Sequence, residues 1–240
     1  MTTKEHYENH LAHFYEWMVG DFETAQSETL DFFERNRIKP LQNKVTIDLG
    51  SGHGLQSIAL AKLGFKVKSV DFNKQLLDCL SIRGKELGIQ VFLQDLLDEV
   101  NFKEQAELMV CMGDTIAHLE SVDDIRLLLD RSFRCLVKNG KLILSYCDYG
   151  TELVDINRFI PVKADDNKIL TCFLEYFIYK VKVTDLLYER IDGHWVQRVS
   201  SYFKLRITNR MIEQLLNKVG FKILKCEVIN RMNYLVAEKE

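Results

Sequence analysis

The sequence lacks any pair of cysteines spaced as C-x-x-C, the arrangement typical of zinc-binding and redox-active sites. We expect most of its six scattered cysteines to be reduced core residues. The N-terminal segment has no apolar signal region, and no apolar run reaches the length of a membrane span. The formal net charge of -3 provides no basic excess for coating a nucleic acid. We therefore expect a cytoplasmic protein without a membrane or nucleic-acid partner.

A complete set of metal ligands is also missing. His6, His10 and His13 share one face of a predicted helix, and the first two have the i, i+4 spacing of a zinc-binding pair. Glu8 comes one position later than the acid of the H-E-x-x-H motif, and no nearby cysteine or fourth histidine completes the set. We therefore expect no metal site, and we expect these histidines to be exposed to solvent near the chain end.

The most informative stretch runs from Val45 to Gly54. A short apolar β-type run is followed by glycines at positions 50, 52 and 54, and a helical pattern begins at Leu55. Glycines permit a tight turn and let a nucleotide-like group approach the backbone closely. This order predicts the first strand, turn and helix of a parallel α/β fold that binds its ligand at the carboxyl end of the strand.

Three further predicted strands end in polar or glycine residues. Lys66–Val70, Ile89–Leu93 and Leu108–Cys111 are followed by Asp71, Asp95 and the segment Met112–Thr115. Asp71 lies about 20 residues past the glycines, the spacing at which a carboxylate can receive two ribose hydroxyls. Because the carboxyl ends of parallel strands meet along one edge, we expect these residues to surround a common site.

The alternation of strands and helices predicts a single α/β domain over residues 1–240. Helical spacing over residues 1–40 predicts an N-terminal helical cap. Residues 41–149 and 207–240 are expected to form the core, which ends in a hairpin. Residues 150–206 carry a hairpin signal at Asp192-Gly193, so we expect an antiparallel β-sheet inserted after the fifth strand.

The segment Asp48–Gly54 resembles the first motif of class I S-adenosylmethionine-dependent methyltransferases. Its third glycine comes one position earlier than in the G-x-G-x-x-G motif of dinucleotide dehydrogenases. Asp71, Asp95 and Cys111–Asp114 match the second, third and fourth motifs of the family in order and spacing. The resemblance implies a Rossmann-like, seven-stranded, mostly parallel sheet with an antiparallel C-terminal hairpin. It also implies S-adenosyl-L-methionine as the cofactor.

The same resemblance implies a role for each residue after these strands. Asp71 would accept the ribose hydroxyls, with Phe72 packed on the adenine, and Asp95 and the Leu96 amide would hydrogen-bond the adenine edge. Met112-Gly113 would lie under the methionine part, and Asp48 would hold the amino-acid tail through its amine or a water. The predicted cofactor contacts are Asp48, Gly50, Ser51, Gly52, Asp71, Phe72, Asp95, Leu96, Met112 and Gly113.

Methyl transfer is an in-line displacement, so an enzyme mainly has to position the acceptor and exclude water. A base is needed only if the acceptor must lose a proton, and His118 is our predicted catalytic residue, ahead of His194. The near-neutral charge and the insertion favour a small-molecule N or O acceptor, and the Gly113–His118 region resembles glycine/sarcosine-type N-methyltransferases. The predicted substrate contacts are Tyr15, Trp17, Asp114 and Arg198.

Other interpretations stay open at this point. Asp71 and Asp95 also suit strand-end polar residues or helix N-caps. RNA or protein methylation is an alternative, but the [N/D]-P-P-[Y/F] motif of amino-group nucleic-acid enzymes is replaced here by Met112–Thr115, and the only prolines are Pro40 and Pro161. A non-catalytic S-adenosylmethionine-binding protein and an NAD-dependent oxidoreductase are further alternatives. The sequence does not decide whether the chain forms a homodimer.

Overall fold

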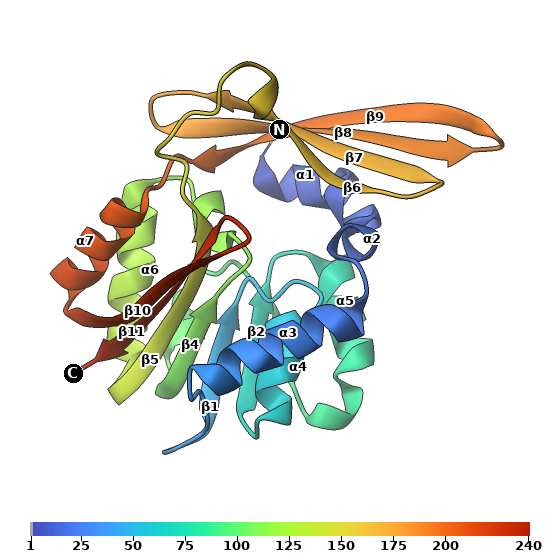
Figure 1. Cartoon of the computed structure of the whole chain (residues 1–240). Helices are drawn as coiled ribbons and strands as arrows, with labels where there is room; N and C mark the ends of the chain where they lie inside the picture. Colours follow the sequence, from blue (N-terminus) through green and yellow to red (C-terminus); the bar gives the residue numbers. More distant parts are fainter. Residues whose placement is uncertain (1) are drawn as a thin grey trace.

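The larger of two β-sheets has seven strands, in a computed structural model that describes residues 2–240 (Figure 1). Its strands are β1 (Val45–Leu49), β2 (Lys66–Asp71), β3 (Gln90–Leu93), β4 (Ala106–Cys111), β5 (Leu136–Cys147), β10 (Phe221–Ile229) and β11 (Met232–Lys239). They are arranged in the order β10-β11-β5-β4-β1-β2-β3. β1 to β5 pair in parallel, whereas β11 runs antiparallel to both β5 and β10. The predicted Rossmann-like sheet with an antiparallel C-terminal hairpin is therefore confirmed.

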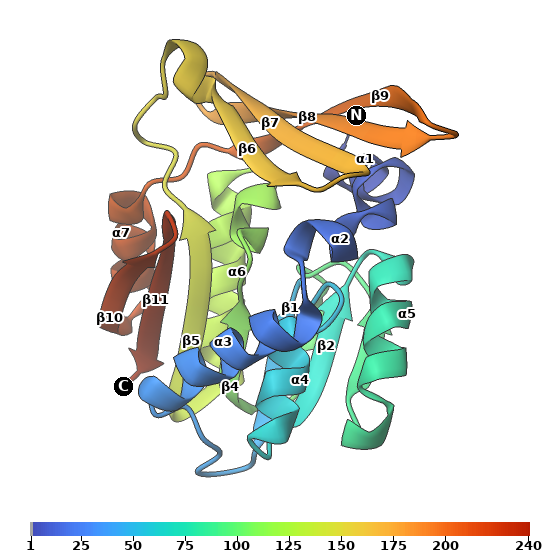
Figure 2. The ribbon, with the colours of Figure 1, turned by 45° about the vertical axis from the view of Figure 1, so that its right-hand side comes forward.

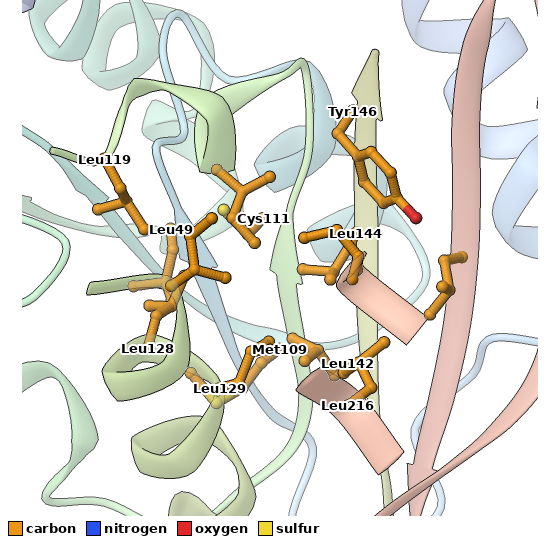
Figure 3. Close-up of a cluster of buried hydrophobic side chains, with 14 of the residues drawn as sticks. Leu49, Met109, Cys111, Leu119, Leu128, Leu129, Leu142, Leu144, Tyr146 and Leu216 are labelled. Atoms are coloured by element: carbon orange, nitrogen blue, oxygen red, sulfur yellow. The ribbon is translucent and has the colours of Figure 1, made fainter. Parts of the chain in front are cut away.

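Helices cover both faces of this sheet because successive strand residues point to opposite sides. They are α3 (Phe22–Arg35), α4 (Leu55–Lys62), α5 (Lys74–Arg83), α6 (Val122–Cys135) and α7 (Asn209–Val219). On one face, Leu128 of α6 shares a buried cluster with Met109 of β4 (Figure 3). On the other face, Phe33 of α3 and Leu60 of α4 share a cluster with Leu108, the neighbour of Met109. The two faces thus bury separate parts of the core.

The second sheet is inserted between β5 and α7. Its four antiparallel strands are β6 (Phe159–Ala164), β7 (Lys168–Tyr176), β8 (Lys180–Ile191) and β9 (His194–Leu205). Asp192 and Gly193 join β8 to β9 with φ values of 49° and 80°, the positive values that a tight hairpin turn requires. Figure 2 shows this sheet above the carboxyl end of β5. The predicted insertion after the fifth strand is confirmed.

The N-terminal region is helical, as expected, and its helices contact two different parts of the molecule. α1 (Thr3–Asn9), a 3-10 turn (Leu11–His13) and α2 (Tyr15–Val19) adjoin the inserted sheet, where Phe14 packs with Leu170 and Leu187. Gly20 then breaks the helical path with a φ of 100°. α3 follows and packs on the core, so the expected cap of residues 1–40 is shared between the inserted sheet and the core.

Two of the three N-terminal histidines are buried, which corrects the expectation that they face solvent. His6 is fully buried, with Nδ1 2.8 Å from Ser200 Oγ and Nε2 3.1 Å from Asp185 Oδ2. His10 is also buried, and its ring centroid lies 5.3 Å from that of His6. Only His13 is exposed. The expectation failed because β8 and β9 cover α1, a contact that residue spacing within α1 does not reveal.

The part of the chain that the structure describes has no membrane-spanning helix, no disulfide and no cluster of metal ligands. No helix within residues 2–240 combines the length and the apolar character needed to cross a membrane. All six cysteines are unpaired; Cys111 and Cys135 are buried, whereas Cys226 is exposed. In the same part of the chain, no three His, Cys, Asp or Glu side chains gather as a metal-ligand set.

Gly54 provides a test of the turn that positions α4. It has a φ of 98°, and a Cβ added there would lie 2.3 Å from Leu80 Cδ1. We expect Gly54→Ala to lower the free energy of unfolding by more than the roughly 1–2 kcal/mol that a left-handed non-glycine residue costs. Gly88→Ala is the matched control, because Gly88 has a φ of 66° but open space around the added Cβ. Urea unfolding measures both variants, and equal losses would contradict the clash with Leu80.

Candidate active site

A cavity of about 1140 Å³ opens at the carboxyl ends of β1 to β4. It brings together nine of the ten predicted cofactor residues, from four strand ends that are far apart in the sequence. These are Gly50, Ser51, Gly52, Asp71, Phe72, Asp95, Leu96, Met112 and Gly113. The parallel order of the strands is the reason that they meet, since every one of these strands ends at the same edge of the sheet.

The glycine turn after β1 packs closely against the segment after β4. Gly50 has a φ of 75°, and a Cβ there would lie 2.3 Å from Thr115 Cγ2. The amides of Gly50 and Ser51 donate to the Val70 carbonyl at 2.8 and 3.0 Å, and the Gly52 amide donates to Asp71. These three amides are therefore hydrogen-bonded within the protein.

Asp71 is held in one orientation by the backbone. Its Oδ2 accepts from the Gly52 amide and its Oδ1 from the Asn73 amide, each at 2.8 Å. A carboxylate oxygen can accept more than one hydrogen bond, so each keeps capacity for a ligand hydroxyl. Burial raises the pKa of this carboxyl, and its side chain lies on the cavity wall. A fixed pair of acceptors of this kind suits a vicinal diol.

Asp48 lies behind the turn and does not line the cavity. It is 1% exposed, and its Oδ2 accepts from Ser57 Oγ at 2.5 Å. Burial raises the pKa of Asp48 to about 7. The structure thus places Asp48 as a buried support behind the turn. Its contact with the ligand tail, through the amine or a water, stays a prediction.

The remaining predicted cofactor residues line the other parts of the same wall. Asp95 is exposed, and its Oδ1 accepts from the Leu97 amide at 2.8 Å. Leu96 and Met112 are buried apolar side chains of the wall. Gly113 donates its amide to Ser145 Oγ at 2.7 Å, which holds the end of β4 to β5. This part of the cavity presents the Asp95 carboxylate beside buried apolar side chains.

His118 lies in an aromatic cluster on the cavity wall. Its ring centroid is 5.7 Å from that of Tyr7 and 5.6 Å from that of Tyr202, and Tyr7 in turn lies 5.6 Å from Phe72. Burial, and next the positive charge of Lys204, lower the pKa of His118 to about 3. Its Nδ1 is buried without a hydrogen-bond partner among the described residues. His118 is thus a neutral imidazole with an unused polar atom.

Tyr7 was missed by the sequence analysis, although it lines the cavity beside His118. Its helical spacing with Leu11 and Phe14 indicates only a packed face, and no motif marks it. Ser51 is a second unpaired group on this wall: it is 3% exposed, and its Oγ has no partner within residues 2–240. Buried polar groups in proteins usually have a hydrogen-bond partner, and a polar ligand or a water in the cavity would supply one to Ser51 and His118.

The predicted substrate contacts do not all lie on the cavity wall. Tyr15 lines the cavity, and its hydroxyl lies 3.8 Å from the position of a Cβ on Gly52. Trp17 does not line it, because its Nε1 donates to Asp165 at 2.5 Å and attaches α2 to the inserted sheet. Arg198 also lies outside, paired with Glu189 at 3.0 Å, and the alternative base His194 is exposed at the start of β9.

Asp114 is buried beneath the cavity instead of facing it. It has a φ of 67°, and its Oδ2 accepts from Lys204 Nζ and from the Tyr149 hydroxyl, both at 2.6 Å. Its Oδ1 accepts from the Cys147 amide at 2.9 Å. Lys204, on β9, was not anticipated from the sequence. Asp114 therefore connects the segment that carries His118 to the inserted sheet.

Part of the chain is similar in sequence to known methyltransferases. Residues 47–144 match a family described as "Methyltransferase domain". The chain is 28% identical over 115 residues to the ubiquinone biosynthesis O-methyltransferase of Pelagibacter ubique, covering 48% of this chain and 47% of that protein. It is 26% identical over 134 residues to the glycine/sarcosine N-methyltransferase of Halorhodospira halochloris, covering 54% and 49%. The chain thus spans about half the length of the curated relatives it matches.

Similarity of fold extends over nearly the whole chain. One solved structure is an S-adenosylmethionine-bound amino pentose methyltransferase from Micromonospora echinaspora, involved in calicheamicin biosynthesis. It matches with a TM-score of 0.75, covering 90% of this chain and 92% of that one. The sequence identity is 14%, so this likeness concerns the fold.

The ion pair of Asp114 and Lys204 provides a test of how the inserted sheet is attached. We expect Lys204→Met to lower the free energy of unfolding by about 3 kcal/mol or more, because it leaves a buried carboxylate without its cation. Adding Asp114→Asn should restore part of that loss. Lys180→Met is the control: Lys180 pairs with Glu120 at an exposed site, so we expect a loss below about 1 kcal/mol. Chemical denaturation measures all variants, and equal losses for the two lysines would contradict this assignment.

Proposed function

Since this chain belongs to the class I S-adenosylmethionine-dependent methyltransferases, we propose that it transfers a methyl group to the N or O atom of a small molecule. One observation carries the proposal: Asp71, fixed by two backbone amides, shares a cavity with the glycine turn and the ends of β3 and β4. Fixed acceptors beside open backbone space suit a ligand with a diol and a nucleoside base. The names of the curated relatives include both O- and N-methyltransferases, which supports either kind of acceptor atom.

The wall residues suit the parts of S-adenosyl-L-methionine. Asp71 would accept the two ribose hydroxyls, and Phe72, Leu96 and Met112 would pack against the adenine and the methionine chain. Asp95 would accept from the adenine amino group. The buried Ser51 Oγ, which has no partner among residues 2–240, would hydrogen-bond the amino-acid tail. These contacts use groups that the fold already holds in place, so binding costs little reorganisation.

The cofactor supplies an electrophilic methyl group on a sulfonium leaving group. His118 is then the residue to orient the acceptor, because its unpaired Nδ1 can accept an N–H or O–H hydrogen bond. Its low pKa makes it a hydrogen-bond acceptor at neutral pH and only a weak base. Tyr7 and Tyr15 would enclose the acceptor and exclude water, which favours displacement.

Charge and composition support a proposal for the class of acceptor and for the cellular compartment. The formal net charge of -3 and the aromatic enclosure of the cavity favour a small molecule over a nucleic acid or a protein side chain. The six unpaired cysteines favour a reducing compartment, and we place the protein in the cytoplasm. A homodimer formed through the inserted sheet is compatible with this function but not required by it.

Calorimetric titration tests the cofactor site. We expect micromolar binding of S-adenosylmethionine and S-adenosylhomocysteine, no binding of NAD, and at least tenfold weaker binding of both adenosyl ligands to Asp71→Ala. The loss is expected because two ligand hydroxyls would lose their charged acceptor. Asp78→Ala is the control, since Asp78 is an exposed residue of α5 that pairs with Lys74. Absence of adenosyl binding, or equal affinity in the Asp71 variant, would refute the site.

Methyl transfer to a set of small amines and phenols tests His118. We expect His118→Ala to lower kcat by about 100-fold, because a positioned hydrogen-bonding group is lost, with the affinity for S-adenosylhomocysteine unchanged. With a pKa of about 3, His118 stays neutral from pH 5 to 8, so its protonation should not reduce kcat in that range. His194→Ala, at an exposed position, should retain full activity. Undiminished turnover in the His118 variant would exclude this residue from catalysis.

A further inference from the structure

The cavity extends beyond the strand ends that suit the cofactor. Gly50–Gly52, Asp71, Asp95 and Met112-Gly113 lie at the ends of β1, β2, β3 and β4, which form one side of the sheet. The opposite side, over β5 and β11, contributes Ser145, Met232 and Tyr234 to the same cavity. If the adenosyl group occupies the first side, the acceptor binds on the second. The residues of this second half therefore select the acceptor.

One face of α3 forms the outer wall of the acceptor half. Residues 25, 28, 29, 32 and 35 of this helix line the cavity, with the i, i+3, i+4, i+7 spacing of a single helical stripe. Figure 2 shows α3 crossing the sheet near β5, and Phe32 packs in one cluster with Tyr234 of β11. Their ring centroids are 5.0 Å apart. The acceptor half thus combines an aromatic pair with the polar side chains of α3.

The charged side chains of the acceptor half that have no ion-pair partner in the described part of the chain are acidic. Glu28 and Asp31 line the cavity, and neither takes part in an ion pair among the described residues. Arg35, the nearby cation, is already paired with Glu227 at 3.1 Å and lies over the Phe32 ring. Glu28 lies one helical turn before Phe32 on the same stripe of α3, so its carboxylate is a neighbour of the aromatic pair.

Acidic side chains outnumber basic ones around the whole cavity. Among the described residues, seven carboxylates line it, against two lysine or arginine side chains. A cleft lined by one sign of charge concentrates ligands of the opposite sign and repels those of the same sign. His118 Nδ1, which is buried without a hydrogen-bond partner among the described residues, adds an unused polar atom to the same cavity wall.

We infer that the acceptor is a small molecule with an apolar or aromatic body and a protonated amine, and that Glu28 binds this amine beside Phe32 and Tyr234. A carboxylate next to aromatic rings suits an ammonium group, which gains both an ion pair and a cation–π contact. The ammonium is the binding group here, and the methylated atom is a different one, next to His118. Anionic acceptors are excluded by the same charges. The inference rests on the proposed methyltransferase function.

Three probes with one phenol skeleton test the inference. Tyramine carries an amine, tyrosol a neutral alcohol and 3-(4-hydroxyphenyl)propanoate a carboxylate at the same end of the molecule. Each is titrated calorimetrically into the full-length protein saturated with S-adenosylhomocysteine. We expect tyramine to bind at least tenfold more tightly than tyrosol and the carboxylate not to bind. Equal affinities, tighter binding of the carboxylate, or no binding of tyramine would overturn the inference.

Glu28→Gln separates this inference from the proposed function. We expect it to weaken tyramine binding at least tenfold, to leave tyrosol binding unchanged, and to leave the affinity for S-adenosylhomocysteine unchanged. Glu34→Gln is the matched control, because Glu34 is an exposed acid of the same helix that does not line the cavity. If S-adenosylhomocysteine binds but tyramine binding is the same in both variants, the acceptor inference fails alone. If S-adenosylhomocysteine does not bind to the wild-type protein, the proposed function itself fails.

Discussion

The ion pair between Asp114 and Lys204 is the contact on which the arrangement of the cavity depends. It joins the segment after β4 to the end of β9, 90 positions later in the chain. Because an unpaired buried carboxylate is costly, the pair holds the inserted sheet in one place over the core. His118 follows Asp114 by four residues and stacks on Tyr202 of β9. The position of the candidate catalytic residue is thus decided by both sheets together.

A second polar contact closes the same side of the molecule. His6 of α1 lies between Asp185 and Ser200 of the inserted sheet and stacks on Tyr202 at 4.2 Å. This contact brings Tyr7, the next residue, to the cavity wall beside Phe72 and His118. The inserted sheet therefore shapes the cavity indirectly: it contacts α1 and the segment after β4, and these two segments carry Tyr7 and His118. In the proposed reaction, exclusion of water from the acceptor depends on this assembly.

The two halves of the cavity differ in how far their polar groups are already satisfied. On the cofactor side, the turn amides and both Asp71 oxygens are hydrogen-bonded within the protein, so the shape of the site is set before a ligand binds. On the acceptor side, Glu28 and Asp31 project from α3 without ion-pair partners among residues 2–240. A preformed cofactor half and a less constrained acceptor half suit an enzyme whose specificity lies in the second half.

The sequence by itself determined the local features of this protein. Three such features are the glycines after β1, the acids at the ends of β2 and β3, and the Asp192-Gly193 hairpin. All of them depend on backbone conformation within a few residues, so their patterns could be read directly. Only the tertiary structure decided the burial of His6, the removal of Trp17 and Arg198 from the site, and the pairing of Asp114 with Lys204. These depend on contacts between segments many residues apart, and no spacing in the sequence encodes which segments will meet.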